Sequence, residues 1–159
     1  MADQEARKTL RSLNSNTPTH VKFINKSRQM VRAWWLNFSG LPVSYGDIRP
    51  GGSLKMNTFL THPWVFRTSD GYVQLLADRE EVYFPTLTEY EDGFPVYKDV
   101  LIISQVNTLQ EYCCMLIRKM VKREDFDKLD IPECLKSDLT RTPDLLKELQ
   151  IARAQYSDG

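Results

Sequence analysis

Residues that build metal sites and nucleophilic active sites are scarce in this chain of 159 residues. It contains two histidines and three cysteines, namely His20, His62, Cys113, Cys114 and Cys134. Because no CxxC pair accompanies the histidines, we expect no structural zinc site with three or four Cys or His ligands. An odd number of cysteines cannot all pair, and two of these are adjacent, which indicates reduced thiols in an intracellular protein.

An excess of charge and long apolar runs are also missing. The chain has 21 Lys and Arg residues against 21 Asp and Glu residues, so it lacks the uncompensated basic charge that nucleic-acid binding needs. The sequence contains no run of 18 apolar residues, the length that a membrane-spanning helix needs. The first ten residues carry acids and no apolar core, so we expect no secretory signal. Neither nucleic acid nor membrane is an expected partner.

Known catalytic motifs do not occur. The sequence contains no GxSxG, HExxH, Walker loop or GxGxxG. Pro50-Gly51-Gly52 lacks the Lys and the following helix of a phosphate-binding loop, and therefore predicts a turn. Cys113 falls in the middle of an apolar helical stripe, where a buried thiol would be protonated and inert. We expect a protein without catalytic activity and without a cofactor.

The composition of the chain changes near residue 105. The first 104 residues hold 12 of the 15 Gly and Pro residues and 14 of the 17 aromatic residues. Short runs such as 20–25 and 34–38 are alternating or continuously β-branched and aromatic, which is typical of strands. We expect a flexible segment over 1–9, then an all-β sandwich over 10–105 whose last strand is 94–104.

In the remainder of the chain, apolar residues recur with the period of an α-helix. Apolar or weakly polar residues recur at i, i+3, i+4, i+7, i+8 and i+11, namely Leu109, Tyr112, Cys113, Leu116, Ile117 and Met120. Thr108 or Asn107 can cap the start of this helix, with Glu111 completing a capping box. A second short helix is expected over 123–129.

Two prolines mark the later helices. Pro132 is expected as the first residue of a third helix, since its missing N–H would have no partner there, and Thr142-Pro143-Asp144 gives the same signal for a last one. The layout is a small α domain of three helices over 106–142, then a C-terminal helix and tail over 143–159.

The small α domain has more apolar surface than it can cover. Roughly 35 residues bury too little surface to fold without a partner. Beside its main stripe, the first helix carries Cys114, Met115 and Val121 on other faces. Two apolar faces indicate two neighbours, which are either the β domain on both sides or, on one side, another chain.

Aromatic residues are concentrated between residues 34 and 67. Seven occur there, Trp34, Trp35, Phe38, Tyr45, Phe59, Trp64 and Phe66. Most are expected in the core, but Tyr45 and Thr58 lie near turn signals, at strand ends where loops build binding sites. An aromatic-walled slot with one hydroxyl and one imidazole could hold a small ring that bears a single polar group.

Several motifs resemble the von Hippel–Lindau tumour-suppressor family over roughly residues 10–155. They are 10–15, Trp35-Leu36-Asn37-Phe38-x-Gly40, Tyr45, Pro50-Gly51, Thr58, His62-x-Trp64-x-Phe66-Arg67, Phe84-Pro85-x-Leu87, Thr108-Leu109-x-x-x-Cys113 and Lys128-Leu129-Asp130-Ile131. The resemblance implies a β-sandwich joined to a three-helix α domain, with the C-terminal helix packing back on the sandwich.

The resemblance also implies a function. It is that of a non-catalytic substrate-recognition subunit of an E3 ubiquitin ligase, in the cytoplasm and nucleus, assembled with elongin C, elongin B and a cullin scaffold with its RING-box protein. The substrate would be hypoxia-inducible factor α, captured through 4-hydroxyproline for ubiquitination and degradation. An alternative is a β-sandwich interaction module that has lost hydroxyproline binding or ligase function.

Site residues carry over from the family onto matching positions. The hydroxyproline-peptide site would comprise Trp35, Tyr45, Asn57, Thr58, His62 and Trp64, with the three aromatic rings around the proline ring and with Thr58 and His62 bonded to its hydroxyl. Elongin C would bind Leu109, Tyr112, Cys113, Leu116 and Ile117, and the cullin would bind Ile131, Pro132, Leu135 and Leu139. The chain departs from the family at Gly46, Asn57 and Thr58, where the family has Pro, His and Ser.

Overall fold

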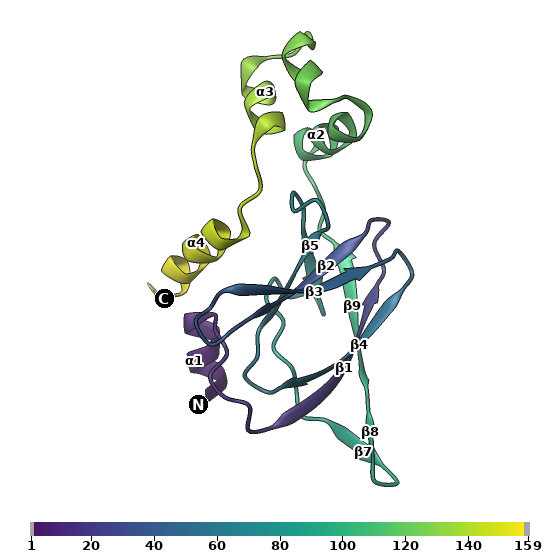
Figure 1. Ribbon diagram of the computed structural model, residues 1–159, viewed down its shortest axis with the longest axis vertical. Helices are drawn as coiled ribbons and strands as arrows, with labels where there is room; N and C mark the ends of the chain where they lie inside the picture. The colour runs from purple at the N-terminus through teal and green to yellow at the C-terminus, as the bar shows by residue number, and fades with distance from the viewer. Residues whose placement is uncertain (1, 158–159) are drawn as a thin grey trace. The chain divides into compact units, whose positions relative to one another are not determined.

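The computed structural model describes residues 2–157 and divides into two compact units. The first unit combines Met1–Ser104 with Asp144–Gly159, and the second is Gln105–Pro143. Figure 1 shows that the first unit contains all the strands and that the second contains only helices.

A seven-stranded sheet forms the body of the first unit. Its order is β3-β2-β5-β6-β9-β1-β4, in which β1 pairs with β9 in parallel and all other neighbours are antiparallel. The strands are β1 (Pro18–Asn25), β2 (Val31–Leu36), β3 (Pro42–Ile48), β4 (Ser53–Phe59), β5 (Trp64–Thr68), β6 (Gln74–Ala77) and β9 (Lys98–Ser104). The predicted all-β first domain is therefore confirmed.

The sheet folds over on itself around aromatic side chains. Alternation along β1 turns Val21 and Phe23 inward. The Phe23 ring lies 5.3 Å from Trp64 and 4.9 Å from Phe66, although both belong to β5, three places away in the sheet. Strands that are distant in the sheet order thus share one core, which makes the sheet a nearly closed sandwich.

A separate hairpin interrupts the strand that the sequence predicted over 94–104. β7 (Glu89–Glu91) pairs only with β8 (Phe94–Val96), and the main sheet resumes one residue later at β9. The two halves bond to different partners, since Phe94 faces Glu91 of the hairpin while Lys98 faces Val21 of β1. The single predicted strand is therefore two.

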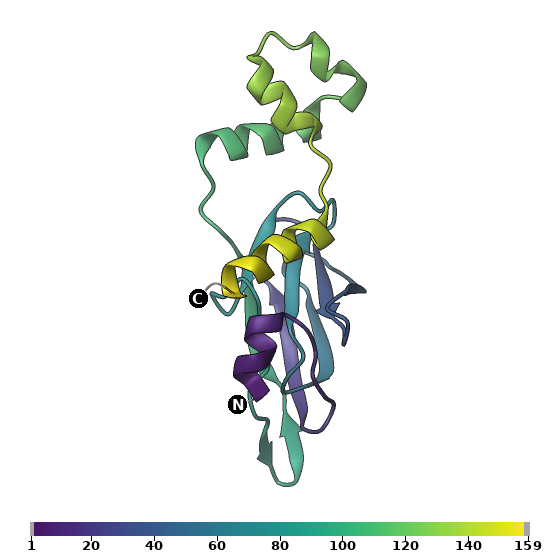
Figure 2. The same cartoon turned by 90° about the vertical axis from the view of Figure 1, so that its left-hand side faces the viewer.

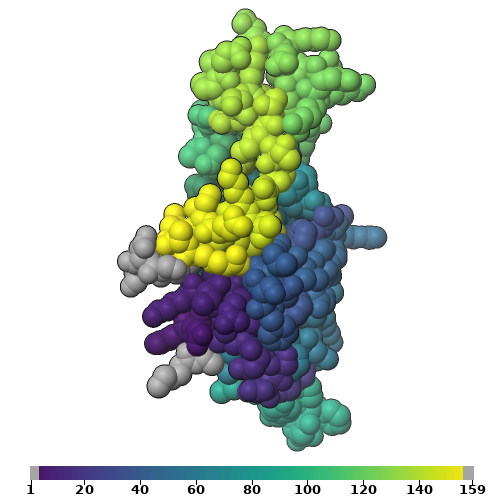
Figure 3. All heavy atoms as spheres, turned by 60° about the vertical axis from the view of Figure 1, so that its left-hand side comes forward, coloured from purple at the N-terminus to yellow at the C-terminus, as the bar shows by residue number. Residues whose placement is uncertain are grey.

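Two helices cover one face of the sheet. α1 (Ala2–Thr9) and α4 (Leu145–Ser157) are the purple and yellow helices of Figure 2. Ala6, Leu10 and Leu149 from these helices and their ends share a buried cluster with Leu36 and Val65 of the sheet. In the space-filling view of Figure 3, the surface of α4 borders that of α1. The C-terminal helix packs back on the sandwich as predicted.

The segment over 1–9, expected to be flexible, is helical from Ala2 onward. Eight residues are too few to form a stable helix in isolation. Ala6 is nevertheless fully buried, because Leu149 arrives beside it from the other end of the chain. The packing partner of this segment lies too far along the sequence to be read from local pattern.

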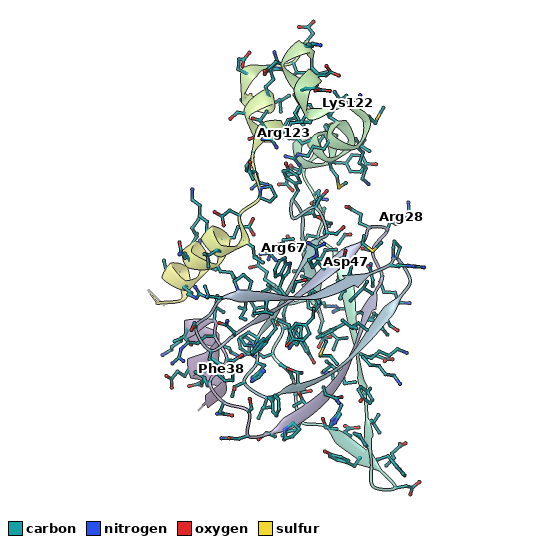
Figure 4. The ribbon with its side chains drawn as sticks, in the orientation of Figure 1. Arg28, Phe38, Asp47, Arg67, Lys122 and Arg123 are labelled. Carbon is teal, nitrogen blue, oxygen red and sulfur yellow. The ribbon has the colours of Figure 1, made fainter. Side chains whose placement is uncertain are left out.

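Two polar contacts fix α4. The Asp144 carboxylate accepts from the Lys147 N–H at 3.2 Å, so Asp144 caps the helix. The Nε of buried Arg67 on β5, which is labelled in Figure 4, donates to Glu148 Oε2 at 3.1 Å. Burial lowers the pKa of the Arg67 guanidinium, and the charge of Glu148 opposes that effect. Glu148 is therefore the main counterion of this buried charge, with a smaller contribution from Glu81.

The second unit consists of three short helices. They are α2 (Leu109–Met120), the 3₁₀ helix η1 (Arg123–Lys128) and α3 (Glu133–Thr140). Thr108 Oγ1 accepts from the Glu111 N–H at 3.1 Å, as the capping motif predicted. Pro132 lies one residue before α3 rather than inside it. A small core of Cys114, Phe126 and Leu139 holds the three helices together.

We expect Leu149→Ala to lower the free energy of unfolding of the first unit by about 2–5 kcal/mol, because it leaves a cavity between α4, α1 and the sheet. The three tryptophans all lie in the first unit, so tryptophan fluorescence during urea unfolding of the full chain measures this unit selectively. Gln150→Ala, at an exposed neighbouring position, should change the value by less than about 0.5 kcal/mol. Equal effects of the two variants would contradict the packing role of Leu149.

Candidate functional site

Four predicted site residues form one set of ring contacts, here called the aromatic cluster. The Trp35 and His62 rings are stacked with centroids 5.2 Å apart. Tyr45 meets Trp35 edge-on at 6.2 Å and Trp64 edge-on at 5.2 Å. Tyr45 therefore joins the two tryptophans, and the structure brings together residues from β2, β3, β5 and the turn before β5.

Strand pairing explains how the two tryptophans meet. Trp35 on β2 and Trp64 on β5 are direct partners across an antiparallel pair. Directly opposite residues project to the same face, and here this is the face that also carries Ala33 and Phe66 into the core. Trp64 is fully within this core, whereas Trp35 packs at its margin.

Tyr45 is positioned by an irregularity in β3. The sequence placed it near a strand end, but it lies in the middle of β3, where the register with β2 shifts between Arg32 and Trp34. Gly46 follows at φ +96°, a conformation that side chains rarely adopt. Such bulges redirect side chains. The Tyr45 side chain remains 43% exposed, so the aromatic cluster reaches the surface there.

Thr58 supplies a buried hydroxyl beneath the cluster. Its Oγ1 accepts from the Trp64 indole Nε1–H at 3.1 Å. A hydroxyl has one donor and two acceptor positions, so the Thr58 proton is still available for a ligand. The bond from Trp64 fixes the hydroxyl oxygen against the ring that would form one wall of the site.

Asn57 does not join the other five predicted residues. It precedes Thr58 on β4, and successive side chains of a strand point to opposite faces. Its Oδ1 accepts from the Tyr97 hydroxyl at 2.7 Å on the exposed face. Strand alternation therefore separates Asn57 from the other five predicted residues of the site.

His62 is held as a neutral imidazole. Its Nε2 lies 3.0 Å from the Asn14 carbonyl oxygen and 3.4 Å from Ser15 Oγ. Burial lowers the pKa of His62, and the bond to Asn14 only partly opposes this. The carbonyl assigns the proton to Nε2, because a carbonyl oxygen can only accept. Nδ1 is then left as a hydrogen-bond acceptor.

The segment before β1 contributes groups that the sequence analysis missed. Trp35 Nε1 donates to Ser12 Oγ at 2.8 Å, and Ser12 Oγ donates to the Leu36 carbonyl at 2.6 Å. Ser12 is fully buried, and the Asn14 carbonyl orients His62. The sequence analysis included 10–15 among the family motifs but gave Ser12 and Asn14 no role in the site.

The arrangement suits a hydroxyl group on an apolar ring. Thr58 can donate a hydrogen bond and His62 Nδ1 can accept one, while Trp35, Tyr45 and Trp64 offer apolar faces. A cavity of about 230 Å³ lies elsewhere, beside Arg7, Leu10 and Phe84. None of the predicted site residues lines that cavity. Ring contacts and hydrogen bonds therefore define the candidate site.

The predicted elongin-binding stripe of α2 is exposed. Leu109 is 79% exposed, and Tyr112, Cys113 and Leu116 are exposed as well. Ile117 is half-buried at the border of the second unit's core. Exposure of this many apolar side chains on one face of a helix is unusual in a protein that acts alone.

The buried thiol of α2 is Cys114 and not Cys113. The expectation for Cys113 assumed that the main apolar stripe would face the core. Instead Cys114, Ile117 and Val121 pack against Phe126. Burial raises the pKa of the Cys114 thiol, which therefore stays protonated at neutral pH. The face of α2 with Cys114 therefore forms the core, and the face with Leu109 and Cys113 stays exposed.

The predicted cullin-binding residues are divided between surface and core. Pro132 is exposed before α3, and Leu135 is half-buried. Leu139 is fully buried among Cys114 and Phe126, and Ile131 packs against the same cluster. Leu139 therefore supports α3 from within and cannot be a contact residue at the surface of this unit.

Among residues 2–157, no group of three His, Cys, Asp or Glu side chains could hold a metal ion. In the same range, no helix is long and apolar enough to cross a membrane.

The predicted site residues lie on both units, with the aromatic cluster on the first unit and the exposed stripe of α2 on the second. Residues 10–91 match the family model of the VHL beta domain, and residues 107–155 match that of the VHL box domain. Since the first match alone covers more than half of the chain, the chain belongs to the VHL family, as the resemblance predicted. Domains of this family are substrate-recognition adaptors of E3 ubiquitin ligases and are generally non-catalytic, and the VHL box is the elongin-binding region of VHL-type proteins.

The lowered pKa of His62 gives a prediction for the pH dependence of stability. In the unfolded chain this pKa has its ordinary value near 6.5, so below that pH the unfolded chain binds a proton more readily than the folded one. Stability should therefore be lost as the pH falls from about 6.5 towards the folded pKa. His62→Gln should reduce the drop in Tm between about pH 7.5 and about pH 5.5, measured by tryptophan fluorescence. His20→Gln leaves the aromatic cluster untouched and serves as the control; identical drops in both variants would contradict the burial of a neutral His62.

Proposed function

We propose that this chain is the substrate-recognition subunit of an elongin B/C–cullin-RING E3 ubiquitin ligase. Its β unit binds 4-hydroxyproline in hypoxia-inducible factor α and directs that protein's ubiquitination and degradation. The complex includes a cullin scaffold with its RING-box protein and works in the cytoplasm and nucleus. The exposed apolar stripe of α2, within the matched VHL box, is the observation that carries this proposal.

The geometry of α2 supports docking on elongin C. Leu109, Cys113 and Leu116 are exposed on one face, while a neighbouring face contributes Cys114 to the core. A helix that presents i, i+4 and i+7 apolar residues fits the groove of a partner. The cullin would meet the same unit near Pro132 and Leu135, with Leu139 holding α3 in place.

The aromatic cluster supports recognition of hydroxyproline. Proline and 4-hydroxyproline differ by one hydroxyl, so a site that distinguishes them must bond that group. The Thr58 proton and the neutral His62 provide one donor and one acceptor, which together match a hydroxyl. A plain proline would leave both unpaired at about 1–3 kcal/mol for each buried group, and sites of this kind discriminate strongly.

We expect Leu109→Ala to weaken elongin C binding by at least about thirtyfold, because a buried anchor contributes about 2–5 kcal/mol. The measurement is co-purification, followed by calorimetry, of the chain with elongin B and elongin C. Since Leu109 is exposed in the free chain, the variant should fold as well as the wild type. Glu111→Ala, on an exposed polar position of the same helix, should bind normally. Equal losses in both variants would mean that another face of α2 docks.

We expect the elongin-bound complex to prefer a hydroxylated hypoxia-inducible factor α peptide over the same peptide with plain proline by more than about tenfold. Thr58→Val keeps the side-chain shape and removes the hydroxyl, so it should erase most of this preference. It also leaves the Trp64 indole N–H unpaired, so a stability loss of about 1–3 kcal/mol is expected with it.

Thr58→Ser is the matched control, since it retains the hydroxyl for both Trp64 and the peptide. Calorimetry with both peptides should show the preference retained in Thr58→Ser. If wild type binds the two peptides equally, the aromatic cluster is core alone, and the alternative of an interaction module without hydroxyproline binding is favoured.

A further inference from the structure

A tight turn between β2 and β3 places one more aromatic ring against the aromatic cluster. Asn37 Oδ1 accepts from the Ser39 and Leu41 N–H groups at 2.9 Å each. The Asn37 carbonyl accepts from the Gly40 N–H at 2.9 Å and from the Ser12 N–H at 3.1 Å. The bonds within the turn fix its shape, whereas its location depends on contacts with other elements.

Phe38 is the residue that this turn presents (Figure 4). Its ring meets Trp35 edge-on at 5.9 Å and His62 edge-on at 5.5 Å. Phe38 is 46% exposed, so its position is not enforced by a surrounding core. The location of the turn therefore decides whether Phe38 covers His62.

Arg153 of α4 holds the turn from outside. Its guanidinium donates through Nη2 to the Gly40 carbonyl, and also to Leu10 O at 3.3 Å and, through Nε, to Thr9 O at 3.1 Å. Thr9 and Leu10 lie at the C-terminal end of α1, where carbonyls lack helical partners and favour a cation. One side chain thus ties the turn to both helices, and Figure 3 shows the surface of α4 bordering α1 and the blue β2–β3 region.

Gly40 allows this close approach. Its φ is +76°, and a Cβ at this position would lie 2.5 Å from Arg153 Nη2 and 3.0 Å from Arg153 Cζ. Any other residue would therefore displace the guanidinium or the turn. The other arginine contact, from Arg11 Nη1 to the Phe38 carbonyl, is longer at 3.4 Å and exposed. Arg153 is thus the shorter and more enclosed of the two arginine contacts to this turn.

We propose that Arg153 is a positioning residue for hydroxyproline recognition, holding Phe38 over His62 and Trp35 from the C-terminal helix. This inference rests on the proposed function, since it concerns the same site. Arg153 bonds to the Gly40 carbonyl of the turn and to the carbonyls of Thr9 and Leu10, so it acts on Phe38 through the turn.

The test compares two variants of α4 in the complex with elongin B and elongin C. Arg153→Met keeps the apolar stem and removes the donors, while Lys147→Met makes the same kind of change at an exposed position of the same helix. Arg153→Met should raise the Kd for the hydroxylated hypoxia-inducible factor α peptide about two- to tenfold, the range for loss of one aromatic edge contact. Lys147→Met should leave it unchanged. Arg153→Lys retains a cation that reaches one carbonyl, and should recover part of the affinity.

A second readout separates positioning from general stability. NMR titration of the two histidines, assigned with His62→Gln, reports the pKa of His62 directly. If Arg153→Met uncovers His62, water reaches the imidazole and its pKa should rise towards the ordinary value near 6.5. A loss of stability alone would leave this pKa unchanged in the folded protein.

Gly40→Ala tests the same contact from the other side. It should raise the Kd for the hydroxylated peptide as Arg153→Met does. Since both single variants break the same contact, the double variant should raise the Kd by less than the product of the two single factors. A wild-type Kd and an unchanged His62 pKa in Arg153→Met would overturn the positioning role and leave the proposed function standing. Failure of the wild type itself to bind the hydroxylated peptide would overturn the proposed function, and the His62 titration would then decide the role of Arg153 alone.

Discussion

The return of α4 to the β unit is the contact on which much of the rest depends. Leu149 completes a buried cluster with Ala6 of α1 and Val65 of β5. Glu148 supplies the counterion for buried Arg67, and Arg153 reaches the turn that carries Phe38. Because these three residues are on one helix, the packing of α1, the ion pair of Arg67 and the position of the turn with Phe38 all depend on the docking of α4.

The second unit depends on a competition between two faces of α2. A three-helix core can bury only one of them, and the face with Cys114 is the one that packs against Phe126 and Leu139. The face with Leu109 and Cys113 remains exposed although it is the more apolar. Burying it against a partner removes apolar surface from water, which is the driving force for association.

The aromatic cluster shows how a folded core can extend into a recognition surface. Trp64 belongs to the sandwich core, yet its indole N–H orients the Thr58 hydroxyl. Trp35 bonds to buried Ser12, and His62 bonds to the Asn14 carbonyl. These partners fix the directions of the two indole N–H groups, the Thr58 hydroxyl and the His62 imidazole, while a donor on Thr58 and an acceptor on His62 are left over.

The sequence by itself determined the β-then-α order, the helix start at Thr108 and five residues of the candidate site that the fold brings together, Trp35, Tyr45, Thr58, His62 and Trp64. Turn residues, the two-residue alternation of strands, the 3.6-residue period of helices and the family motifs carry that information locally. Only the tertiary structure decided that residues 2–9 are helical, that Asn57 faces away, that Cys114 and not Cys113 is buried, and that Ser12 and Arg153 support the aromatic cluster. Periodicity shows which side chains share a face, but which face finds a packing partner depends on segments far away along the chain.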